Sequence, residues 1–422
     1  MRGFVQVLSL QLRALWRSRA LAILASVSVA WMFALPRIAR SDGTVDGARQ
    51  LVIRYALGGV FALVLVTLAA AAAGSLSKDR ATRRLALTQV RPVRYFTVAF
   101  GRFAAFLLSG AATLALAAAI LYATVGGRDR VCDHVLAPVL ESPRAEAEKM
   151  YEVFMADPDT PKEAKLAKKS VVLRLLTQKA VDHYQTVPVG ATATWRFRPG
   201  ALARAASGRV AARLKFTNTM DTRDDVIGRF AFGGWTGSVS NITQAVVVAP
   251  LAPSGDGTLP EDGELSFVNE AGGGLMLRPR RDVNLLIGAD TFGWNLFRAW
   301  CQLVSALAVV LAFATFLGAC LGRSVAVFTV LAILFVSEVG PGLIEQYPDQ
   351  LETSRRDRIG LALMRGVGAV TRPFGALHPL ESLACDECVE PAGTLEALAV
   401  DAALLPLFLC LAAALAMPRK QE

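Results

Sequence analysis

The stretch SKDRATRRLALTQVRPVRYFTVAFGR, residues 77–102, joins two long apolar runs, residues 51–74 and 98–125. It contains seven Lys or Arg residues and a single acid, Asp79. Short loops rich in Lys and Arg stay on the cytoplasmic side of a membrane, whereas long insertions cross it regardless of their charge. We therefore expect this segment to be cytoplasmic, and its position then orients the rest of the chain.

The composition predicts an integral membrane protein. Of the 422 residues, 54% are hydrophobic, and the mean hydropathy is +0.43. A soluble domain is about 45–50% apolar, and the apolar runs in this chain are long enough to cross a hydrocarbon core of roughly 30 Å. The net charge of +10 also suits nucleic-acid binding, but no basic groove with interleaved aromatics is visible. We expect membrane lipids as partners and no nucleic acid.

The apolar runs predict a predominantly α-helical bundle of six spans. These are residues 20–36, 51–74, 98–125, 294–321, 325–339 and 395–417. In domain terms, residues 20–125 hold spans 1–3 with the cytoplasmic turn at 77–97, residues 291–343 hold spans 4–5, and residues 395–417 form span 6. The tail, residues 418–422, is basic and is expected to be cytoplasmic.

Residues 1–19 predict an amphipathic helix. Its apolar side chains recur at helical spacing: Phe4, Val7, Leu8, Leu12, Leu15 and Trp16. Such a helix can lie in the headgroup plane of a membrane. The alternative is that it extends the first span into the cytoplasm.

Residues 126–290 predict an α+β insert between spans 3 and 4. Residues 138–186 are rich in Glu, Lys, Ala and Leu and are expected to be helical. Residues 190–288 are expected to form a small antiparallel β-sandwich, because short strands alternate with Gly and Pro turns. The candidate strands are residues 194–198, 209–217, 225–232, 244–250, 264–269 and 274–287.

Six spans place both termini in the cytoplasm and residues 126–290 outside a cytoplasmic (inner) membrane. Residues 344–394 are then an extracytoplasmic loop with partial helices, because their charge density does not permit a full span. Their arginines are unfavourable for an outer face, so the topology is least constrained here: Arg355, Arg356, Arg358, Arg365 and Arg372.

The whole pattern resembles the membrane subunit of a type-2 ABC exporter, a member of the type-2 ABC transporter permease family. That family has an interfacial amino-terminal helix, six spans, and a charged turn between spans 2 and 3. The matching residues in this turn are Asp79, Arg80, Ala81, Thr82, residues 85–87, Pro92, Gly101 and Arg102. Asp79 replaces a commoner Glu, and Ala81 replaces a usual Gly. The resemblance covers residues 1–125 and 294–417 and excludes the insert.

The resemblance implies that this chain is the permease subunit of an ATP-driven exporter and works as a dimer with a second copy or a similar half. In the family the turn docks as a coupling helix in a groove of a separate ATP-binding subunit. Apolar anchors and arginines that pair with acids on the partner are suited to such docking. The implied coupling residues are Asp79, Arg80, Arg83, Arg84, Leu85, Leu87 and Arg91. The alternative is a solvated loop that binds only headgroups.

No nucleotide-binding or catalytic motif is visible in the sequence. The pattern G-x-x-x-x-G-K-[ST] is absent, as are H-E-x-x-H and G-x-S-x-G. We therefore predict that the chain is not an enzyme and carries no cofactor, and we expect ATP and Mg²⁺ on the partner subunit.

Three cysteines outside the apolar runs are candidates for a disulfide. Cys385 and Cys388 form a C-x-x-C pair, and Cys132 lies two residues before His134; all are predicted to be outside. An oxidising compartment favours a disulfide between two of them. The alternatives are unpaired thiols or a tetrahedral zinc site, and we predict no metal.

Two carboxylates lie at membrane depth. Glu338 is near the outer end of the fifth predicted span, and Asp401 is within the sixth. Ionisable groups in spans are rare unless they pair or face a polar path. They are candidate residues of a translocation pathway; alternatively each reaches water or pairs with a residue such as Arg54.

A second function class fits the same architecture. The chain can be a non-transporting membrane anchor, whose outer sandwich binds or assembles envelope components. A sandwich fold does not identify its ligand. The two hypotheses differ in whether the basic turn binds an ATPase.

Overall fold

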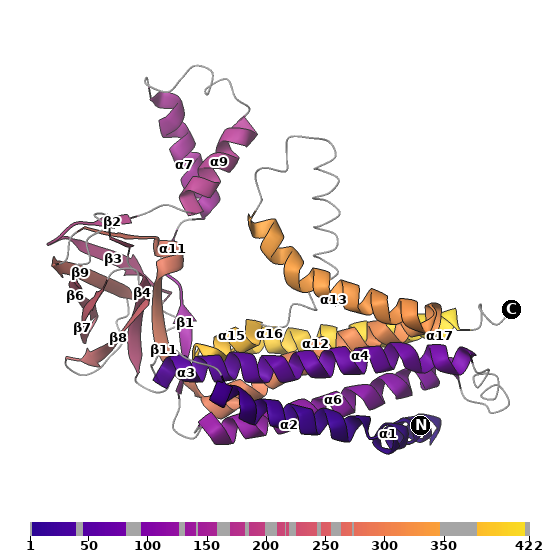
Figure 1. Cartoon of the computed structure of the whole chain (residues 1–422). Helices are drawn as coiled ribbons and strands as arrows, with labels where there is room; N and C mark the ends of the chain where they lie inside the picture. The colour runs from indigo at the N-terminus through magenta and orange to yellow at the C-terminus, as the bar shows by residue number, and fades with distance from the viewer. Residues whose placement is uncertain are drawn as a thin grey trace. The chain divides into compact units, whose positions relative to one another are not determined.

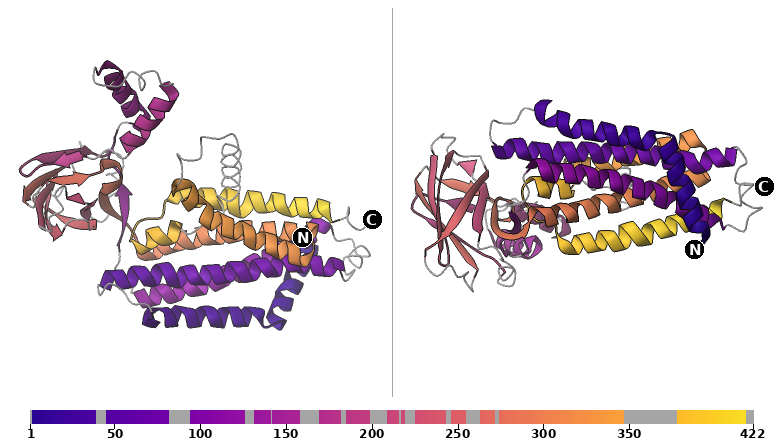
Figure 2. Two further views of the ribbon diagram at one scale, coloured as in Figure 1. Left: turned by 45° about the horizontal axis from the view of Figure 1, so that its top comes forward. Right: turned by 90° about the horizontal axis from the view of Figure 1, so that it is seen from below.

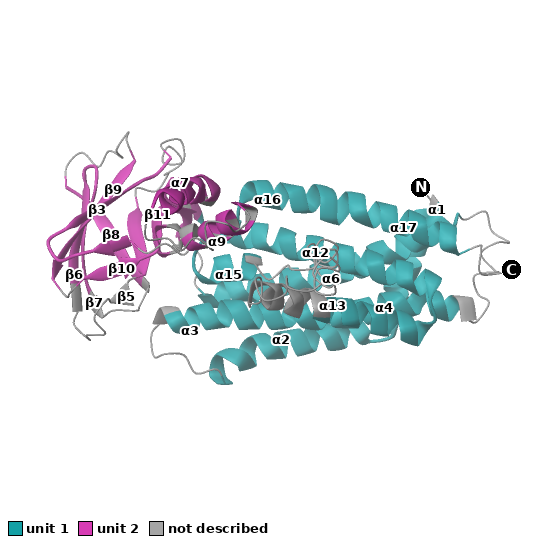
Figure 3. Ribbon diagram, turned by 90° about the horizontal axis from the view of Figure 1, so that it is seen from above, with its two compact units in different colours: residues 1–130, 291–422 teal, residues 131–290 magenta. Residues whose placement is uncertain are grey.

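The computed structural model describes residues 2–38, 45–81, 94–125, 131–140, 142–157, 169–181, 185–198, 209–215, 217–218, 225–242, 246–254, 263–271, 274–346 and 378–417. The protein is mostly helical and has a separate region of antiparallel sheet. It divides into two compact units, which Figure 3 shows in different colours. Unit 1 comprises Met1–Arg130 and Thr291–Glu422, and unit 2 comprises Val131–Asp290. The insert expected from the sequence, residues 126–290, coincides with unit 2 within five residues.

Unit 1 is a bundle of helices (Figure 1). In chain order these are α1 (Arg2–Arg17), α2 (Ala20–Ile38), α3 (Val45–Leu51), the π-helix η1 (Val52–Leu57), α4 (Gly58–Ala81), α6 (Tyr95–Val125), α12 (Phe292–Cys320), α13 (Arg323–Gln346), α15 (His378–Ala384), α16 (Pro391–Glu396), the π-helix η4 (Ala397–Leu404) and α17 (Leu405–Ala416).

Within the described residues, five helices are long and apolar enough to cross a membrane: Ala20–Ile38, Gly47–Asp79, Tyr95–Val125, Phe292–Cys320 and Pro391–Ala416. They indicate a multi-pass membrane protein. The predicted fifth span lies in α13, where the apolar stretch Arg323–Phe335 is shorter than the others. Six spans therefore stay a prediction.

The second span is longer than the sequence suggested. The prediction began at residue 51 and ended at 74, whereas the helix extends from Gly47 to Asp79. Arg49 and Arg54 near its start, and Lys78 near its end, interrupt the apolar pattern but not the helix. A charged side chain at a helix end can reach the aqueous interface while the backbone stays helical.

Helix α12 forms the centre of unit 1. It packs against α4, α6, α13, α17 and η4, and most of its side chains are buried. Gly318 permits the closest approach, because a Cβ there would lie well inside van der Waals contact with the backbone oxygen of Ala73 on α4. Gly110 on α6 has the same role, since its Cβ would lie 2.5 Å from the Leu307 side chain. Small residues at such crossings are the usual basis of helix association in membranes.

Unit 2 contains two sheets. Its strands are β1 (Val131–Leu136), β2 (Gln185–Val187), β3 (Thr192–Arg196), β4 (Val210–Lys215), β5 (Thr217–Asn218), β6 (Asp225–Phe232), β7 (Trp235–Ile242), β8 (Val246–Pro253), β9 (Glu264–Ala271), β10 (Leu275–Leu277) and β11 (Val283–Thr291). The larger sheet has the order β1-β11-β4-β8-β7-β6-β9-β3, and the smaller has the order β2-β10-β5. The registers of β4–β8, β6–β7, β6–β9, β3–β9 and β4–β11 are all antiparallel.

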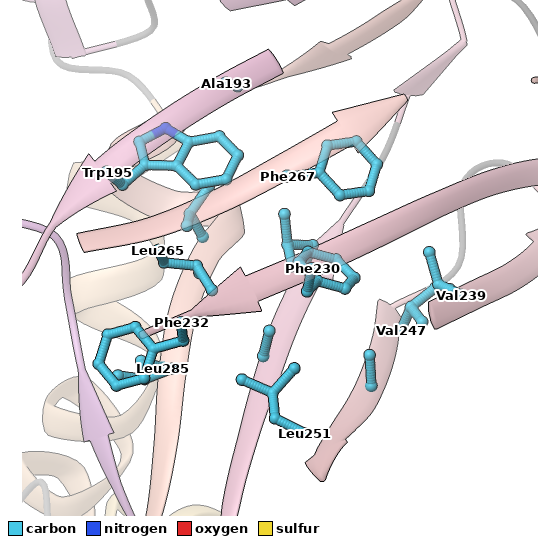
Figure 4. Close-up of a cluster of buried hydrophobic side chains, with 14 of the residues drawn as sticks. Ala193, Trp195, Phe230, Phe232, Val239, Val247, Leu251, Leu265, Phe267 and Leu285 are labelled. Atoms are coloured by element: carbon cyan, nitrogen blue, oxygen red, sulfur yellow. The ribbon is translucent and has the colours of Figure 1, made fainter. Parts of the chain in front are cut away.

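Aromatic and aliphatic side chains together fill the core of unit 2, as Figure 4 shows. The rings of Phe230 on β6 and Phe267 on β9 lie 4.8 Å apart between centroids, a distance typical of favourable aromatic pairs. Trp195 is buried beside them, and its Nε1 donates a hydrogen bond to Gln185 Oε1 at 3.1 Å. The buried alternation along β3 and β9 is the period of two expected for a half-buried strand.

The predicted strands are confirmed in part. β6 has the predicted bounds, whereas the predicted strand 274–287 is wrong as a single element. It divides into β10, the short helix α11 (Pro279–Asp282) and β11. Pro279 lacks a donor for the ladder, and the Asp282 carboxylate accepts the Arg278 backbone N–H at 2.8 Å. The sequence also missed β7, because its Gly237 and Asn241 have low strand propensity.

The predicted helical part of the insert contains α7 (Pro143–Ala156) and α9 (Lys169–Val181), which pack against each other. Ser142 caps α7 by accepting the Ala145 backbone N–H at 3.2 Å. On α9, the Val172 side chain is buried, whereas Val171 and Leu175 are exposed.

Candidate functional site

The basic turn joins α4 to α6. α4 ends at Ala81 and α6 begins at Tyr95. Arg83, Arg84, Leu85, Leu87 and Arg91 lie outside the described residues, so the predicted docking face stays a prediction. Arg80 belongs to the last turn of α4. The described part of this site is the base of the turn.

An ion pair bridges the two helices at the base of the turn. Arg102 on α6 donates through Nη2 to the Asp79 carboxylate on α4, and through Nη1 to the Ser75 carbonyl oxygen at 2.9 Å. The two charged side chains are only 14% and 22% exposed. Charge-assisted hydrogen bonds in such partly buried places are stronger than neutral ones. Both residues belong to the turn motif seen in the sequence, but their contact was not predicted.

A small apolar cluster lies on the same helix ends. It joins side chains from α4, α6, α12 and α17: Leu76, Val98, Ala99, Ala319, Ala413 and Met417. Tyr95 and Phe316 pack against it. Close-packed side chains transmit displacement because they leave few voids to absorb it. The base of the turn is therefore mechanically connected to four helices.

The amphipathic helix α1 packs on the first turns of α6. The rings of Phe4 and Phe100 lie 5.5 Å apart, and a Cβ on Gly101 would lie 2.8 Å from Val7. Beside this contact, Trp16 is 74% exposed and Val5 58% exposed. The predicted helix is confirmed, and part of its apolar face contacts α6 while the adjoining part is open to the surroundings.

The ends of several segments meet at this end of unit 1 (Figure 2). α1 lies here, the α4–α6 turn starts here, and Arg323 at the start of α13 lies beside Gly74. Exposed basic side chains surround the turn base: Arg13, Arg17, Lys78, Arg94 and Arg323. Among the described residues at this end, the basic side chains outnumber the acidic ones. The acidic residue Asp79 forms an ion pair with Arg102.

At the opposite end, polar side chains of α12 hold the start of the last span and the segment before it. Asn295 is fully buried; its Nδ2 donates to the Glu387 carbonyl at 2.8 Å, and its Oδ1 accepts the Val389 N–H at 2.7 Å. Gln302 Nε2 donates to Thr394 Oγ1 at 3.1 Å. Neither Asn295 nor Gln302 was predicted from the sequence. The available signal was a pair of amide side chains within a span, where polar groups are costly unless bonded.

The two candidate pathway carboxylates fall in different helices. Glu338 belongs to α13, and its side chain lies outside the described part. Asp401 is half-buried in η4, which packs against α12. π-helical turns are often found at functional sites. Arg54, named as a partner, lies with its Nη1 3.9 Å from Glu381 Oε1, and both side chains are mostly exposed.

The three candidate disulfide cysteines are divided between the units. Cys132 is buried in β1 of unit 2, whereas Cys385 and Cys388 follow α15 in unit 1, around a turn where Asp386 has a φ of 56°. A disulfide among them stays a prediction. No group of three or more His, Cys, Asp or Glu side chains that could hold a metal ion occurs in the described part of the chain.

Neither a protein-family model, nor a curated protein, nor a solved structure matches this chain. The resemblance to exporter permeases therefore rests on the residues of the turn and on the order of the helices.

Proposed function

We propose that this chain is the permease subunit of an ATP-driven ABC exporter of the cytoplasmic membrane, and that it couples to a separate ATP-binding subunit. The observation that supports this most is the base of the basic turn. There the Asp79–Arg102 pair joins α4 to α6, beside an apolar cluster shared by four helices. A force applied to the turn by a partner therefore reaches the core of the bundle.

The charges of unit 1 support the orientation in this proposal. Exposed basic side chains predominate around the turn, whereas both signs occur at the other end, where Arg49 and Arg54 accompany Glu381, Glu387 and Glu390. The positive-inside tendency assigns the basic end to the cytoplasm. The chain enters unit 2 after the end of α6 and leaves it before the start of α12, and both of these helix ends are opposite to the basic end. Unit 2 is then extracytoplasmic.

The proposed mechanism is a shift between two arrangements of the bundle. ATP binding to the partner favours one arrangement only if the partner binds that arrangement more tightly. Movement of the turn tilts α4 and α6 together, because Arg102 links them, and α1 follows because it packs on α6. At the far end, the contacts of Asn295 with the segment before the last span, and of Gln302 with its first turn, then reorganise. Asp401 lines the path.

Co-purification tests the proposal directly. The tagged full-length chain, extracted from its native membrane in a mild detergent, is expected to bring down a protein with an ATP-binding motif and ATPase activity. Recovery without any ATP-binding protein contradicts the exporter proposal and favours the anchor.

A charge reversal tests the location of the contact. The double variant Arg83→Glu, Arg84→Glu is expected to lose the ATPase, because reversed charges repel the acids that those arginines would pair with. The matched control reverses Arg13 and Arg17, which are exposed on α1, and is expected to keep the ATPase. If the turn variant retains both binding and ATPase stimulation, the contact lies elsewhere.

A further inference from the structure

A pocket of about 460 Å³ lies between α6 and α12, near the ends of these helices that connect to unit 2. On the α6 side its floor consists of Ala115, Ala118 and Ala119, and on the α12 side its walls include Phe297 and Trp300. The volume is within the range of ligand sites, roughly 300–1,000 Å³. The hollow arises because small residues on α6 face large rings on α12.

The walls of the pocket are held in place. Trp300 Nε1 donates a hydrogen bond to the Ala111 carbonyl oxygen at 3.3 Å. Phe297 stacks between Trp294 and Trp300, with centroid distances of 5.3 and 5.8 Å. Gly293 preserves the space beside Tyr122, because a Cβ there would lie 3.2 Å from that ring. The pocket therefore exists before any occupant arrives.

The chemistry of the lining selects an apolar occupant. The Trp300 N–H is already bonded to Ala111, the alanine and Phe297 side chains are hydrocarbon, and the Tyr122 ring brings a single hydroxyl. A bound water needs two to four polar partners, which this surface does not offer. Phe297 is 47% exposed, so the pocket is open to the medium around unit 1. Because α6 and α12 are both apolar enough to span, that medium is hydrocarbon.

The dimensions identify the kind of apolar molecule. The pocket begins at Ala115, ten residues before the end of α6 at Val125, which is about 15 Å at 1.5 Å per residue. This length is about half the thickness of a hydrocarbon core of roughly 30 Å, so the pocket lies within one leaflet. A helix from a second copy would cross both leaflets, whereas the lining of the pocket is confined to one end of α6 and α12. A single extended hydrocarbon chain fits.

We propose that this pocket binds one acyl chain of a membrane phospholipid, in the leaflet on the side of unit 2. The bound chain fills the hollow between α6 and α12 at that depth. The proposal requires that both helices cross the membrane, and it is independent of transport.

Photolabelling of the full-length protein tests the proposal. The protein is placed in nanodiscs of phosphatidylethanolamine and phosphatidylglycerol that contain a phosphatidylethanolamine with a diazirine in its acyl chain. After irradiation, labelled peptides are identified by mass spectrometry. Peptides with residues 115–122 and 293–300 are expected to carry at least about threefold more label than the exposed face of α13 (Val325, Phe328), because a seated chain makes many more close contacts.

Two matched variants make the test specific. Ala118→Leu fills the pocket and is expected to remove the excess label, whereas Ala112→Leu, at an exposed position of α6 outside the pocket, is expected to retain it. Both must keep the elution volume and thermal midpoint of the wild type. If Ala118→Leu does not fold, Gly293→Ala narrows the same space and replaces it.

Three outcomes would overturn the proposal. The first is labelling of the pocket peptides no stronger than that of α13. The second is excess label that persists after the pocket is filled. The third is an Ala119→Cys variant that forms a disulfide-linked dimer in the membrane where the wild type forms none, since a second copy would then cover the pocket.

Discussion

The buried amide of Asn295 on α12 clamps the backbone of Val389, with Oδ1 2.7 Å from the Val389 nitrogen. Its other amide atom, Nδ2, donates to the Glu387 carbonyl at 2.8 Å. One side chain thus satisfies two backbone groups of the segment that leads into the last span. Unit 1 is consequently held at both ends by polar contacts: Asn295 at one end, and the Asp79–Arg102 pair at the other.

Replacing Asn295 by Leu should destabilise unit 1. The change keeps a similar volume but leaves the Glu387 carbonyl and the Val389 N–H without this partner, at a cost of roughly 1–3 kcal/mol. A lowered thermal midpoint in nanodiscs is the expected measurement. Thr329→Val is the control, because Thr329 donates to the Val325 carbonyl of its own helix, and its midpoint should hardly move. Equal effects of the two changes would contradict the clamp.

The Asp79–Arg102 pair should show non-additive substitutions. Asp79→Asn and Arg102→Met each leave a partly buried charge without its partner, and the double variant removes both charges. We therefore expect the double variant to be less destabilised than the sum of the single variants, by about 1 kcal/mol. Thermal unfolding of the four proteins completes the cycle. Strict additivity would show that the two residues act separately.

ATPase stimulation in the presence of the partner subunit is a second measurement on the same variants. If the pair connects the turn to the bundle, Asp79→Asn should weaken the dependence of ATPase activity on the permease while co-purification of the subunit persists. Unchanged stimulation would restrict the pair to a structural role.

Two neighbouring glycines provide a direct test of the packing of α12 on α4. Gly318→Ala places a methyl group against the Ala73 backbone oxygen, which cannot move away cheaply, and overpacking of this kind costs about 1–3 kcal/mol. Gly322→Ala meets nothing within 4 Å and should be tolerated. Expression and thermal midpoint distinguish them. Comparable behaviour of both variants would mean that the helices cross elsewhere.

The core of unit 2 should depend strongly on its phenylalanine pair. Phe267→Ala removes a fully buried ring that packs on Phe230, at an expected cost of about 3–5 kcal/mol. The control is Val248→Ala on β8, whose side chain is about half exposed. Urea titration of the full chain, read by proteolytic release of fragments from residues 131–290, measures the difference. If Phe267→Ala lowers the stability of unit 2 no more than Val248→Ala does, the proposed packing of this core is wrong.

The sequence predicted the classes of element better than their limits. Within the described residues, long apolar runs located five helices that are long enough to span, because about 20 apolar residues have few other stable environments. The ends were misjudged where charges such as Arg49 and Lys78 continue a helix beyond the apolar run. In unit 2, β6 followed its period of two, whereas the break in 274–287 depended on Pro279 and on the cap that Asp282 provides.

By itself, the sequence determined that this is a multi-pass membrane protein with a separate folded insert, because hydropathy and turn residues are local properties of the chain. Only the tertiary structure decided which polar residues meet. Asp79 and Arg102 are 23 residues apart, and Asn295 and Val389 are 94 apart. Such pairs depend on how helices pack, and a backbone N–H or carbonyl acceptor leaves no mark in the sequence. The pocket between α6 and α12 arises in the same way, from alanines on one helix that face rings on another.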